Sequence, residues 1–306
     1  MPVEIERRIS RGATLIELVV VLALIGIVGS VIGGSLLRQE RFYRGATELL
    51  GARENVRDAM EVLATDLRGL AVADTVRLMS DSAVEFFADI GVVSTCSSAT
   101  GTALGLAGRS GSRGNTFTAL LTAPDSGDLA VIYRAGSDTA GPSWERARIE
   151  SFASRSVATV CPEPTAFAVG EGGSGFLLTL AAPLTSPVPA GTPIRVIRRG
   201  RYSIYRAGDG GWYLGYRRCN ALGPSVCGAV QPLSGPYRPY SSDRSQTGLL
   251  FEYFDGGDAP AASALDLARV RITARSESRQ RILLEGRQWK PADSATVSIA
   301  VRNRAP

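Results

Sequence analysis

The chain of 306 residues contains no histidine and a single lysine, Lys290. The missing histidine excludes Ser-His-Asp and Cys-His catalysis, imidazole acid–base chemistry and metal sites with histidine ligands. One lysine leaves little basis for a serine–lysine nucleophile. Arginine therefore supplies nearly all the positive charge, and the formal net charge of +5 is too small to identify an anionic partner. We expect neither an enzyme nor a resident cofactor.

Cysteine is also scarce, and no two cysteines form a Cys-x-x-Cys pair, so the sequence indicates no zinc site. An even number of cysteines in a chain with a membrane-export segment favours two disulfides formed in an oxidising compartment. The alternative is four buried thiols. The short loop "CNALGPSVC" closes easily, which pairs the last two cysteines and leaves the first two for each other. The expected pairs are Cys219–Cys227 and Cys96–Cys161.

One apolar run stands near the N-terminus. Residues 18–37 carry no charge, and about twenty helical residues span roughly 30 Å, the thickness of the hydrocarbon core. Arg7, Arg8 and Arg11 precede the run, which predicts a cytoplasmic N-terminus and an exported remainder. A carboxylate, Glu17, stands at the head of the run, although an ionised acid in hydrocarbon costs about 2.5–3.5 kcal/mol.

The pattern after the apolar run stays helical and becomes amphipathic. Apolar residues step by three or four along one face, with charged residues on the others. We predict one helix from about Ala13 to about Leu70, loosened at its glycines, with a sheet packed on the apolar stripe. The glycines are Gly26, Gly29, Gly33 and Gly34; the stripe is Leu49, Ala52, Val56, Met60, Leu63, Leu67 and Leu70.

From about residue 83 the sequence consists of short apolar or alternating runs between Gly, Ser and Pro, which is typical of strands. Asp209–Gly211 reads as a hairpin turn, and segments 97–115 and 220–247 read as long loops. The predicted strands are 83–90, 117–123, 128–135, 146–153, 176–183, 193–207, 211–218, 248–255, 268–276 and 295–303. The fold class is therefore α+β, a long N-terminal helix packed on a mostly antiparallel sheet.

The junction before the apolar run reads Gly12, Ala13, Thr14-Leu15-Ile16, Glu17. It resembles the signal of type IV prepilins and pseudopilins, with alanine at position 13 where phenylalanine is usual. The resemblance implies that a prepilin peptidase cuts after Gly12 and that Ala13 becomes an N-methylated N-terminus. It also implies that Glu17 pairs with the N-terminal amine of a neighbouring subunit. The alternative is a stray glutamate in a plain signal anchor.

The resemblance divides the chain into a leader (1–12), a membrane and assembly half-helix (13–37), an amphipathic half-helix (38–71) and an exported β-rich body (72–306). The stretch 51–71, "GARENVRDAMEVLATDLRGLA", resembles the helix end of PilW-type minor pilins and of GspJ-type minor pseudopilins, and chain length favours the former. Either would be a low-copy subunit of a tip or initiation complex. Its partners would be the peptidase, other pilins or pseudopilins and the inner-membrane assembly platform.

Two further clusters, one of arginines and one of carboxylates, each allow a binding role and a simpler structural interpretation. Arginines interleaved with aromatic residues suit nucleic acid, although the alternation of a half-packed hairpin explains the same spacing and is favoured. These candidate DNA contacts are Arg198, Arg199, Arg201, Arg217 and Arg218. Carboxylates in "FEYFDGGDAP" offer oxygen ligands for calcium, although an Asp/Gly turn is favoured. They are Glu252, Asp255 and Asp258.

Overall fold

The computed structural model describes residues 14–70, 76–108, 118–136, 141–162, 174–278, 281–284 and 287–301. The chain forms two compact units, each described below by itself. The first comprises the chain up to Gly51 together with Ser278–Pro291. The second comprises Ala52–Glu277 and the segment from Ala292 onward.

A single helix, α1 (Leu15–Arg68), matches the predicted helix closely. No proline occurs between Pro2 and Pro124, so nothing removes a helical hydrogen bond. The helix is continuous through the glycines where loosening was expected, and a Cβ at any of them would meet no atom within 4 Å. These glycines therefore leave shallow, uncrowded places on the helix surface rather than breaks.

The first unit contains the N-terminal part of α1 and a short hairpin. The hairpin consists of β13 (Ile282–Leu284) and β14 (Arg287–Trp289), paired antiparallel. The Ser278 hydroxyl donates a hydrogen bond to the carboxylate of Glu48 on α1, and the Ser278 amide donates to the Pro291 carbonyl at 2.8 Å. These two bonds hold the base of the hairpin.

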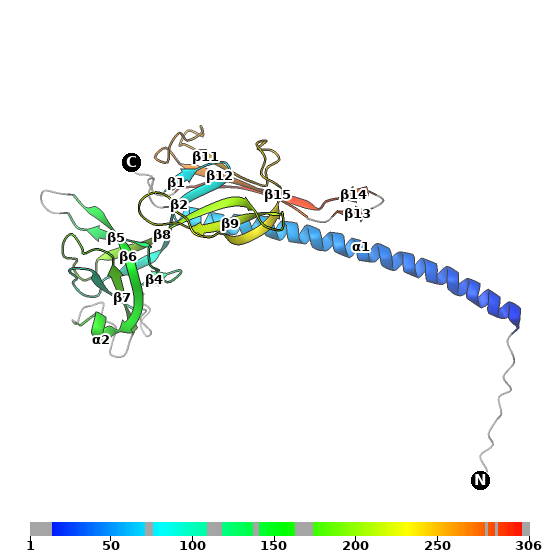
Figure 1. The fold of residues 1–306 in the computed structure, drawn as a ribbon, viewed down its shortest axis with the longest axis horizontal. Helices are drawn as coiled ribbons and strands as arrows, with labels where there is room; N and C mark the ends of the chain where they lie inside the picture. Colours follow the sequence, from blue (N-terminus) through cyan, green and yellow to red (C-terminus); the bar gives the residue numbers. More distant parts are fainter. Residues whose placement is uncertain are drawn as a thin grey trace, which may run out of the picture. The chain divides into compact units, whose positions relative to one another are not determined.

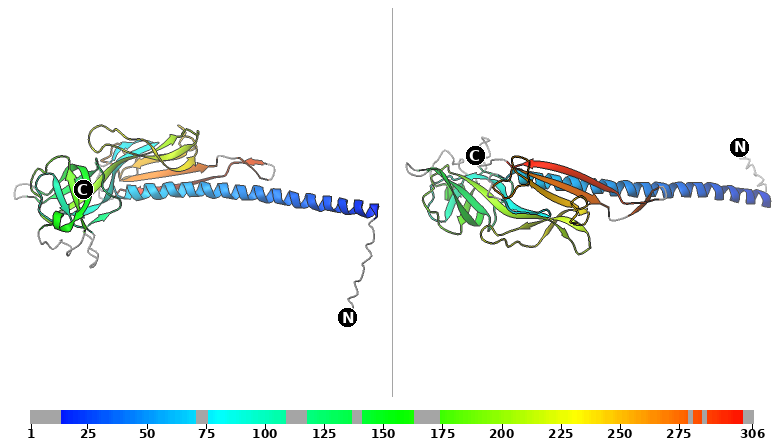
Figure 2. Two further views of the ribbon diagram at one scale, coloured as in Figure 1. Left: turned by 60° about the horizontal axis from the view of Figure 1, so that its bottom comes forward. Right: turned by 90° about the horizontal axis from the view of Figure 1, so that it is seen from above.

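The second unit contains the C-terminal part of α1 and two groups of strands (Figures 1 and 2). We call the first group the sheet lobe. It packs on α1 through the predicted apolar stripe: Val56, Leu63 and Leu67 are buried against Phe86 and Phe251. Its strands are β1 (Val76–Met79), β9 (Trp212–Arg218), β10 (Gln231–Tyr237), β11 (Leu249–Phe254), β12 (Arg269–Glu277) and β15 (Ala292–Ala300), with parts of β2 (Ala83–Ser94) and β8 (Pro193–Arg206).

The second group, the barrel lobe, closes on itself. Its strands pair in the order β2, β8, β5 (Leu129–Arg134), β6 (Ser143–Ser156), β7 (Ser174–Leu180) and β3 (Ala103–Leu106). The ring closes where β3 meets the end of β2: the Cys96 amide donates to the Gly105 carbonyl at 3.0 Å, and the Ala107 amide donates to the Ser94 carbonyl at 3.1 Å. A separate core fills it, including Leu104, Ile132, Ile149, Leu178 and Val196. Figure 1 shows β5, β6 and β7 beyond the C-terminal end of α1.

The two lobes share one ribbon, the antiparallel pair β2–β8, which is registered from Ala83↔Ser203 to Ser94↔Pro193. The N-terminal part of β8 pairs with β5, and its C-terminal part pairs with β9. On β2, the neighbour changes from β1 to the short strand β4 (Ala119–Leu120) at Gly91. We call the place where β8 changes partner the fork.

Two predicted loops contain strands. Segment 220–247 includes β10, which its two prolines conceal because proline is rare inside strands. Segment 97–115 includes β3, a short strand of alanine, glycine and two leucines that lacks β-branched and aromatic side chains. The loop predictions are wrong at these places. Predicted strand 117–123 is reduced to β4, whereas β6 extends beyond its predicted ends.

Two disulfides are present, in the pairing that the sequence favoured. Cys96, at the end of β2, is joined to Cys161, which follows the short helix α2 (Val157–Val160), with a Cα–Cα distance of 5.4 Å. Cys219 is joined to Cys227 across the loop after β9, with a Cα–Cα distance of 3.9 Å. The first links positions 65 residues apart within the barrel lobe, and the second links positions 8 apart.

We expect the two disulfides to contribute unequally to stability. In the chain-entropy model, closing a 65-residue loop stabilises by about 4 kcal/mol and closing an 8-residue loop by about 2.5 kcal/mol. Replacing Cys96 and Cys161 with alanine should therefore lower the free energy of unfolding more than replacing Cys219 and Cys227. Denaturant unfolding of the full chain in detergent micelles measures both. Equal losses would contradict the loop-length argument.

Candidate functional site

The N-terminal end of α1 begins with a capping pattern. Thr14 precedes the helix, and its hydroxyl oxygen accepts a hydrogen bond from the Glu17 amide at 3.3 Å. A threonine followed three residues later by glutamate is a frequent helix-start signature, because the threonine satisfies an amide that lacks a helical partner. The sequence Thr-Leu-Ile-Glu thus sets the start of the helix locally.

Glu17 lies in the first helical turn, where the partial positive charge of the helix end favours an anion. Its side chain is exposed and has no hydrogen-bond or ion-pair partner among the residues that the structure describes. The flanking Ile16 and Leu18 are 73% and 57% exposed. The carboxylate is therefore a charge in apolar surroundings that only the helix end favours, and it is available to a cation from outside the chain.

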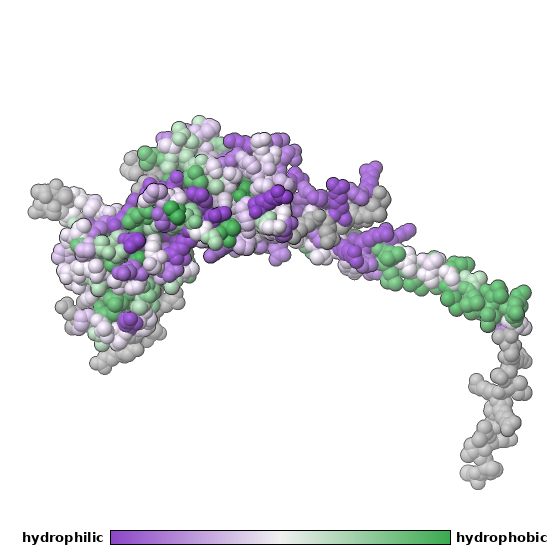
Figure 3. Space-filling model, in the orientation of Figure 1, coloured by the Kyte–Doolittle hydropathy of each residue, from purple (hydrophilic) through white to green (hydrophobic). Residues whose placement is uncertain are grey.

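The surface that follows is apolar on every side. Figure 3 shows this surface along the first part of α1. Its large side chains, from Leu15 to Leu37, are all about half exposed or more. Among the described residues, α1 is the one helix that is long and apolar enough to cross a membrane, by length and composition. Gly12 and Ala13, the predicted cleavage and methylation positions, lie outside the described residues.

Three of the five arginines proposed as nucleic-acid contacts lie beside the fork, on β8. Arg199 and Arg201 both bind the carboxylate of Glu85, a fully buried residue of β2, with Nε–O distances of 2.7 and 2.8 Å. Ser225, in the disulfide loop, donates to the same carboxylate at 2.7 Å. Burial raises the pKa of Glu85, but these hydrogen bonds outweigh it and hold the pKa below its usual value.

A second buried carboxylate holds the other side of the fork. Asp128 accepts two hydrogen bonds from Arg198, at 2.9 and 2.7 Å, and one from Arg218 at 3.0 Å. Its hydrogen bonds to Arg198 raise the pKa of that guanidinium. Four of the candidate arginines are therefore engaged by the body's own carboxylates. The fifth, Arg217, is half-buried on β9. Nucleic-acid binding stays a prediction, with no open basic surface at these four residues.

The three carboxylates proposed for calcium do not converge. Glu252 faces Arg271 at 3.9 Å, and Asp258 binds Arg269 at 2.8 Å. Asp255 accepts hydrogen bonds from two backbone amides of its own turn, at 2.8 and 2.9 Å. The arrangement is that of a hydrogen-bonded Asp/Gly turn between strands, the interpretation that the sequence favoured.

Sequence analysis did not identify the partners that organise these groups. Glu85 interrupts the apolar run "AVEFF", which is itself a signal for a buried counter-charge. Asp66, near the end of α1, accepts a hydrogen bond from the Tyr202 hydroxyl. Burial raises the pKa of Asp66, and the hydrogen bond from Tyr202 partly offsets that rise. The partners come from distant strands, so sequence spacing could not pair them.

A comparison with family models identifies one match, the prokaryotic N-terminal methylation motif, over residues 7–33. No curated protein and no solved structure matches the chain. The matched segment contains Gly12, Ala13 and Glu17. The chain thus carries a type IV pilin-like prepilin signal, which indicates a substrate of prepilin peptidase that is anchored in a membrane by its N-terminus and assembles with other pilins.

The buried carboxylate at the fork should be essential for stability. Replacing Glu85 with glutamine leaves Arg199, whose side chain is 7% exposed, without a counter-charge, and loss of one partner of a buried pair costs about 3–5 kcal/mol. Chemical unfolding of the full chain in micelles at pH 7 measures this loss. Glu150→Gln, an exposed strand position, is the matched control and should change little.

The same residue should make the protein sensitive to acid. Because the pKa of Glu85 is lowered on folding, its contribution is complete above the unfolded value of 4.5 and is lost as the pH falls through the folded value. Stability of the wild type should therefore fall more steeply below pH 4.5 than that of Glu85→Gln. Parallel curves for the two proteins would contradict the assignment.

Proposed function

We propose that this chain is a minor pilin, a low-copy structural subunit of the tip or initiation complex of a type IV pilus, most similar to the PilW type. The observation that carries the proposal is the methylation motif running directly into α1, where the Glu17 carboxylate lies in an apolar surface without a partner among the described residues. The body supports a structural rather than catalytic role, because it lacks histidine and its arginine–carboxylate clusters are internally paired.

In this proposal, prepilin peptidase cuts between Gly12 and Ala13, and the new Ala13 amine is methylated. The mature chain then starts one residue before the Thr14 cap. Removal of the leader exposes an ammonium group at the head of the apolar helix. A carboxylate in hydrocarbon costs about 2.5–3.5 kcal/mol alone. The ammonium of a neighbouring subunit offsets much of that cost, so Glu17 acts as a docking and register device.

Charge alone does not fix the orientation, because Arg38, Arg41 and Arg44 follow the apolar run as Arg7, Arg8 and Arg11 precede it. The two disulfides supply a second argument, since they form in oxidising compartments. They support a cytoplasmic N-terminus and an exported body, anchored first in the inner membrane and then carried into the filament by the assembly platform.

The barrel lobe supports a terminal position in the filament. It lies beyond the C-terminal end of α1, on the side where a further subunit would stack if helices were aligned along a filament axis (Figure 1). A bulky lobe at that place is accommodated most easily at or next to the tip, where few subunits follow. A GspJ-like minor pseudopilin of a type II secretion system is the alternative, since its assembly would use the same helix and signal.

Processing gives the first test. Intact-mass analysis and N-terminal sequencing of membrane-extracted protein should show an N-terminus at Ala13, carrying one added methyl group, only in cells that contain prepilin peptidase. Gly12→Val should leave the chain uncut because the position before the cut would no longer be glycine. An uncut terminus in the wild type would make residues 10–39 a plain signal anchor.

Glu17→Ala tests assembly separately from processing. The variant should be cleaved normally, whereas its incorporation beside wild-type subunits should fall by about tenfold or more, because the buried ammonium of a neighbour would lose its partner. Quantitative immunoblotting of sheared filaments measures incorporation, and Glu54→Ala, on the exposed part of the same helix, is the control. Equal incorporation of Glu17→Ala and wild type would remove the proposed role.

A further inference from the structure

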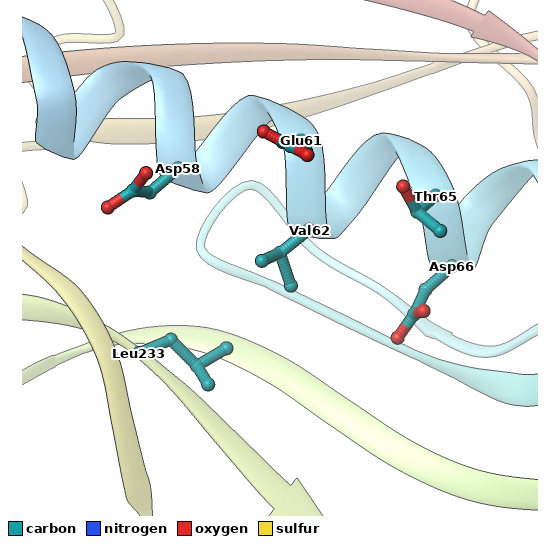
Figure 4. A pocket seen from close by; sticks show the side chains of 6 residues that line it. All are labelled: Asp58, Glu61, Val62, Thr65, Asp66 and Leu233. Carbon is teal, nitrogen blue, oxygen red and sulfur yellow. The ribbon is translucent and has the colours of Figure 1, made fainter. Parts of the chain in front are cut away.

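A groove runs beside the C-terminal part of α1, with a volume of about 470 Å³. Helix α1 lines one wall, and Leu233 of β10, 41% exposed, faces it from the other side (Figure 4). The lining helix residues are Asp58, Glu61, Val62, Thr65 and Asp66. Val62 and Leu233 make the inner surface apolar, and three carboxylates lie along the helix wall.

Two of these carboxylates are available to bind a cation. Asp58 and Glu61 are exposed, and neither forms a hydrogen bond or ion pair with another residue in the described part of the chain. The third, Asp66, uses one carboxylate oxygen to accept from Tyr202. The groove therefore combines an apolar inner surface with unneutralised negative charge on one wall.

An arginine side chain matches this combination. Its aliphatic stem packs on apolar surface, whereas its planar guanidinium forms paired hydrogen bonds with carboxylates. The described arginines nearest to the groove on the same helix do not fill it, because Arg57 and Arg68 are exposed and do not line it. A guanidinium from a second molecule would fill it.

The same helix carries a set of arginines directly after its apolar run, Arg38, Arg41 and Arg44, which we call the collar. All three are exposed; Arg44 pairs with Glu40, and Arg38 and Arg41 have no partner among the described residues. If the body is exported, the collar lies on the side of the membrane where arginine is disfavoured. The positive-inside bias therefore does not explain its position.

The spacing of the arginines in the collar matches the spacing of the carboxylates in the groove. Arg38 and Arg41 are three residues apart, as are Asp58 and Glu61. One shift of twenty residues between two parallel helices therefore brings Arg38 opposite Asp58 and Arg41 opposite Glu61. At a rise of about 1.5 Å per residue, that shift is a stagger of about 30 Å. A shift of seventeen residues, about 26 Å, does the same for Arg41 and Arg44.

We propose that the groove binds the arginine collar of a second copy of this chain, with the two α1 helices parallel and staggered by about 26–30 Å. The inference rests on the proposed filament role and adds to it a homotypic contact outside the apolar run. This contact selects an axial register by charge, whereas apolar surface that is uniform around the helix selects none. The low copy number of the subunit accommodates two adjacent copies.

Charge reversal on each side tests the contact. Two differently tagged full-length chains are expressed separately in cells that lack prepilin peptidase and all other pilins, and each is extracted in mild detergent. They are then mixed in micelles, where no bilayer holds the two apolar runs at one depth, and their co-purification is quantified. Arg38→Glu with Arg41→Glu in both tagged chains should reduce recovery by about tenfold, as should Asp58→Arg with Glu61→Arg, because each places like charges opposite each other. Chains that carry all four changes should recover near wild-type association.

The matched control is Arg148→Glu with Arg155→Glu, which makes the same change in charge at exposed positions of β6. It should leave co-purification unchanged, and intact disulfides on non-reducing gels show that each variant has folded. A loss with the collar variant but not with the groove variant would assign the collar to lipid headgroups and overturn the proposal. Failure of the fourfold variant to recover, or no association of the wild type, would also overturn it.

The result of this co-purification experiment does not depend on whether the chain assembles into a filament. The assay needs neither cleavage at Gly12 nor filament assembly, and Glu17→Ala should associate as the wild type does in it. Normal processing and incorporation without homotypic association would leave the minor-pilin role intact and remove only the collar contact.

Discussion

The pairing of β2 with β8 is the constraint on which the second unit depends. One antiparallel ribbon contributes to two hydrophobic cores, because its first part lies over α1 and its second part forms two sides of the barrel. A one-residue slip would turn every side chain of the ribbon to the opposite face and expose both cores at once. The bulge between Asp89 and Gly91 falls where β2 changes neighbours, and a Cβ added at Gly91 would lie 2.2 Å from the Ala119 carbonyl oxygen.

The fork explains why β8 is rich in arginine. Arg199 reaches from β8 into the loop after β9 and donates to the carbonyls of Asn220 and Gly223 at 3.1 Å each. Glu85 and Asp128 supply the negative charge that offsets the cost of burying the guanidiniums of Arg199 and Arg198. Four arginines of this basic and aromatic run, Arg198, Arg199, Arg201 and Arg218, thus bind carboxylates within the body.

Helix α1 presents two surfaces with opposite requirements. Its C-terminal part buries an apolar stripe against the sheet lobe, so its stability comes from within the chain. Its N-terminal part buries none of its apolar span against the described part of the chain. That surface needs a membrane or other helices to cover it, and its single carboxylate needs a cation. In the proposed function, membrane anchoring covers the apolar surface first, and assembly beside a neighbouring subunit then supplies the cation.

The sequence by itself determined what depends on local pattern. Helix α1 was predictable because a long apolar run is followed by an amphipathic stretch, with no proline in its 54 residues. The Gly12–Glu17 signal was readable because it is contiguous. The strands with regular alternation, such as β8 and β12, were also found. Short or proline-bearing strands, such as β3 and β10, were not, since packing overrode their weak propensity.

The tertiary structure alone decided how distant segments meet. The barrel is a long-range property, because β2 and β8 are separated by the strands that close it. The pairing of Arg199 with Glu85, the engagement of Asp128 and the groove between Val62 and Leu233 all join residues at least 70 positions apart. No local pattern encodes such contacts. They arise when two cores form around one ribbon and each buried charge must find its partner.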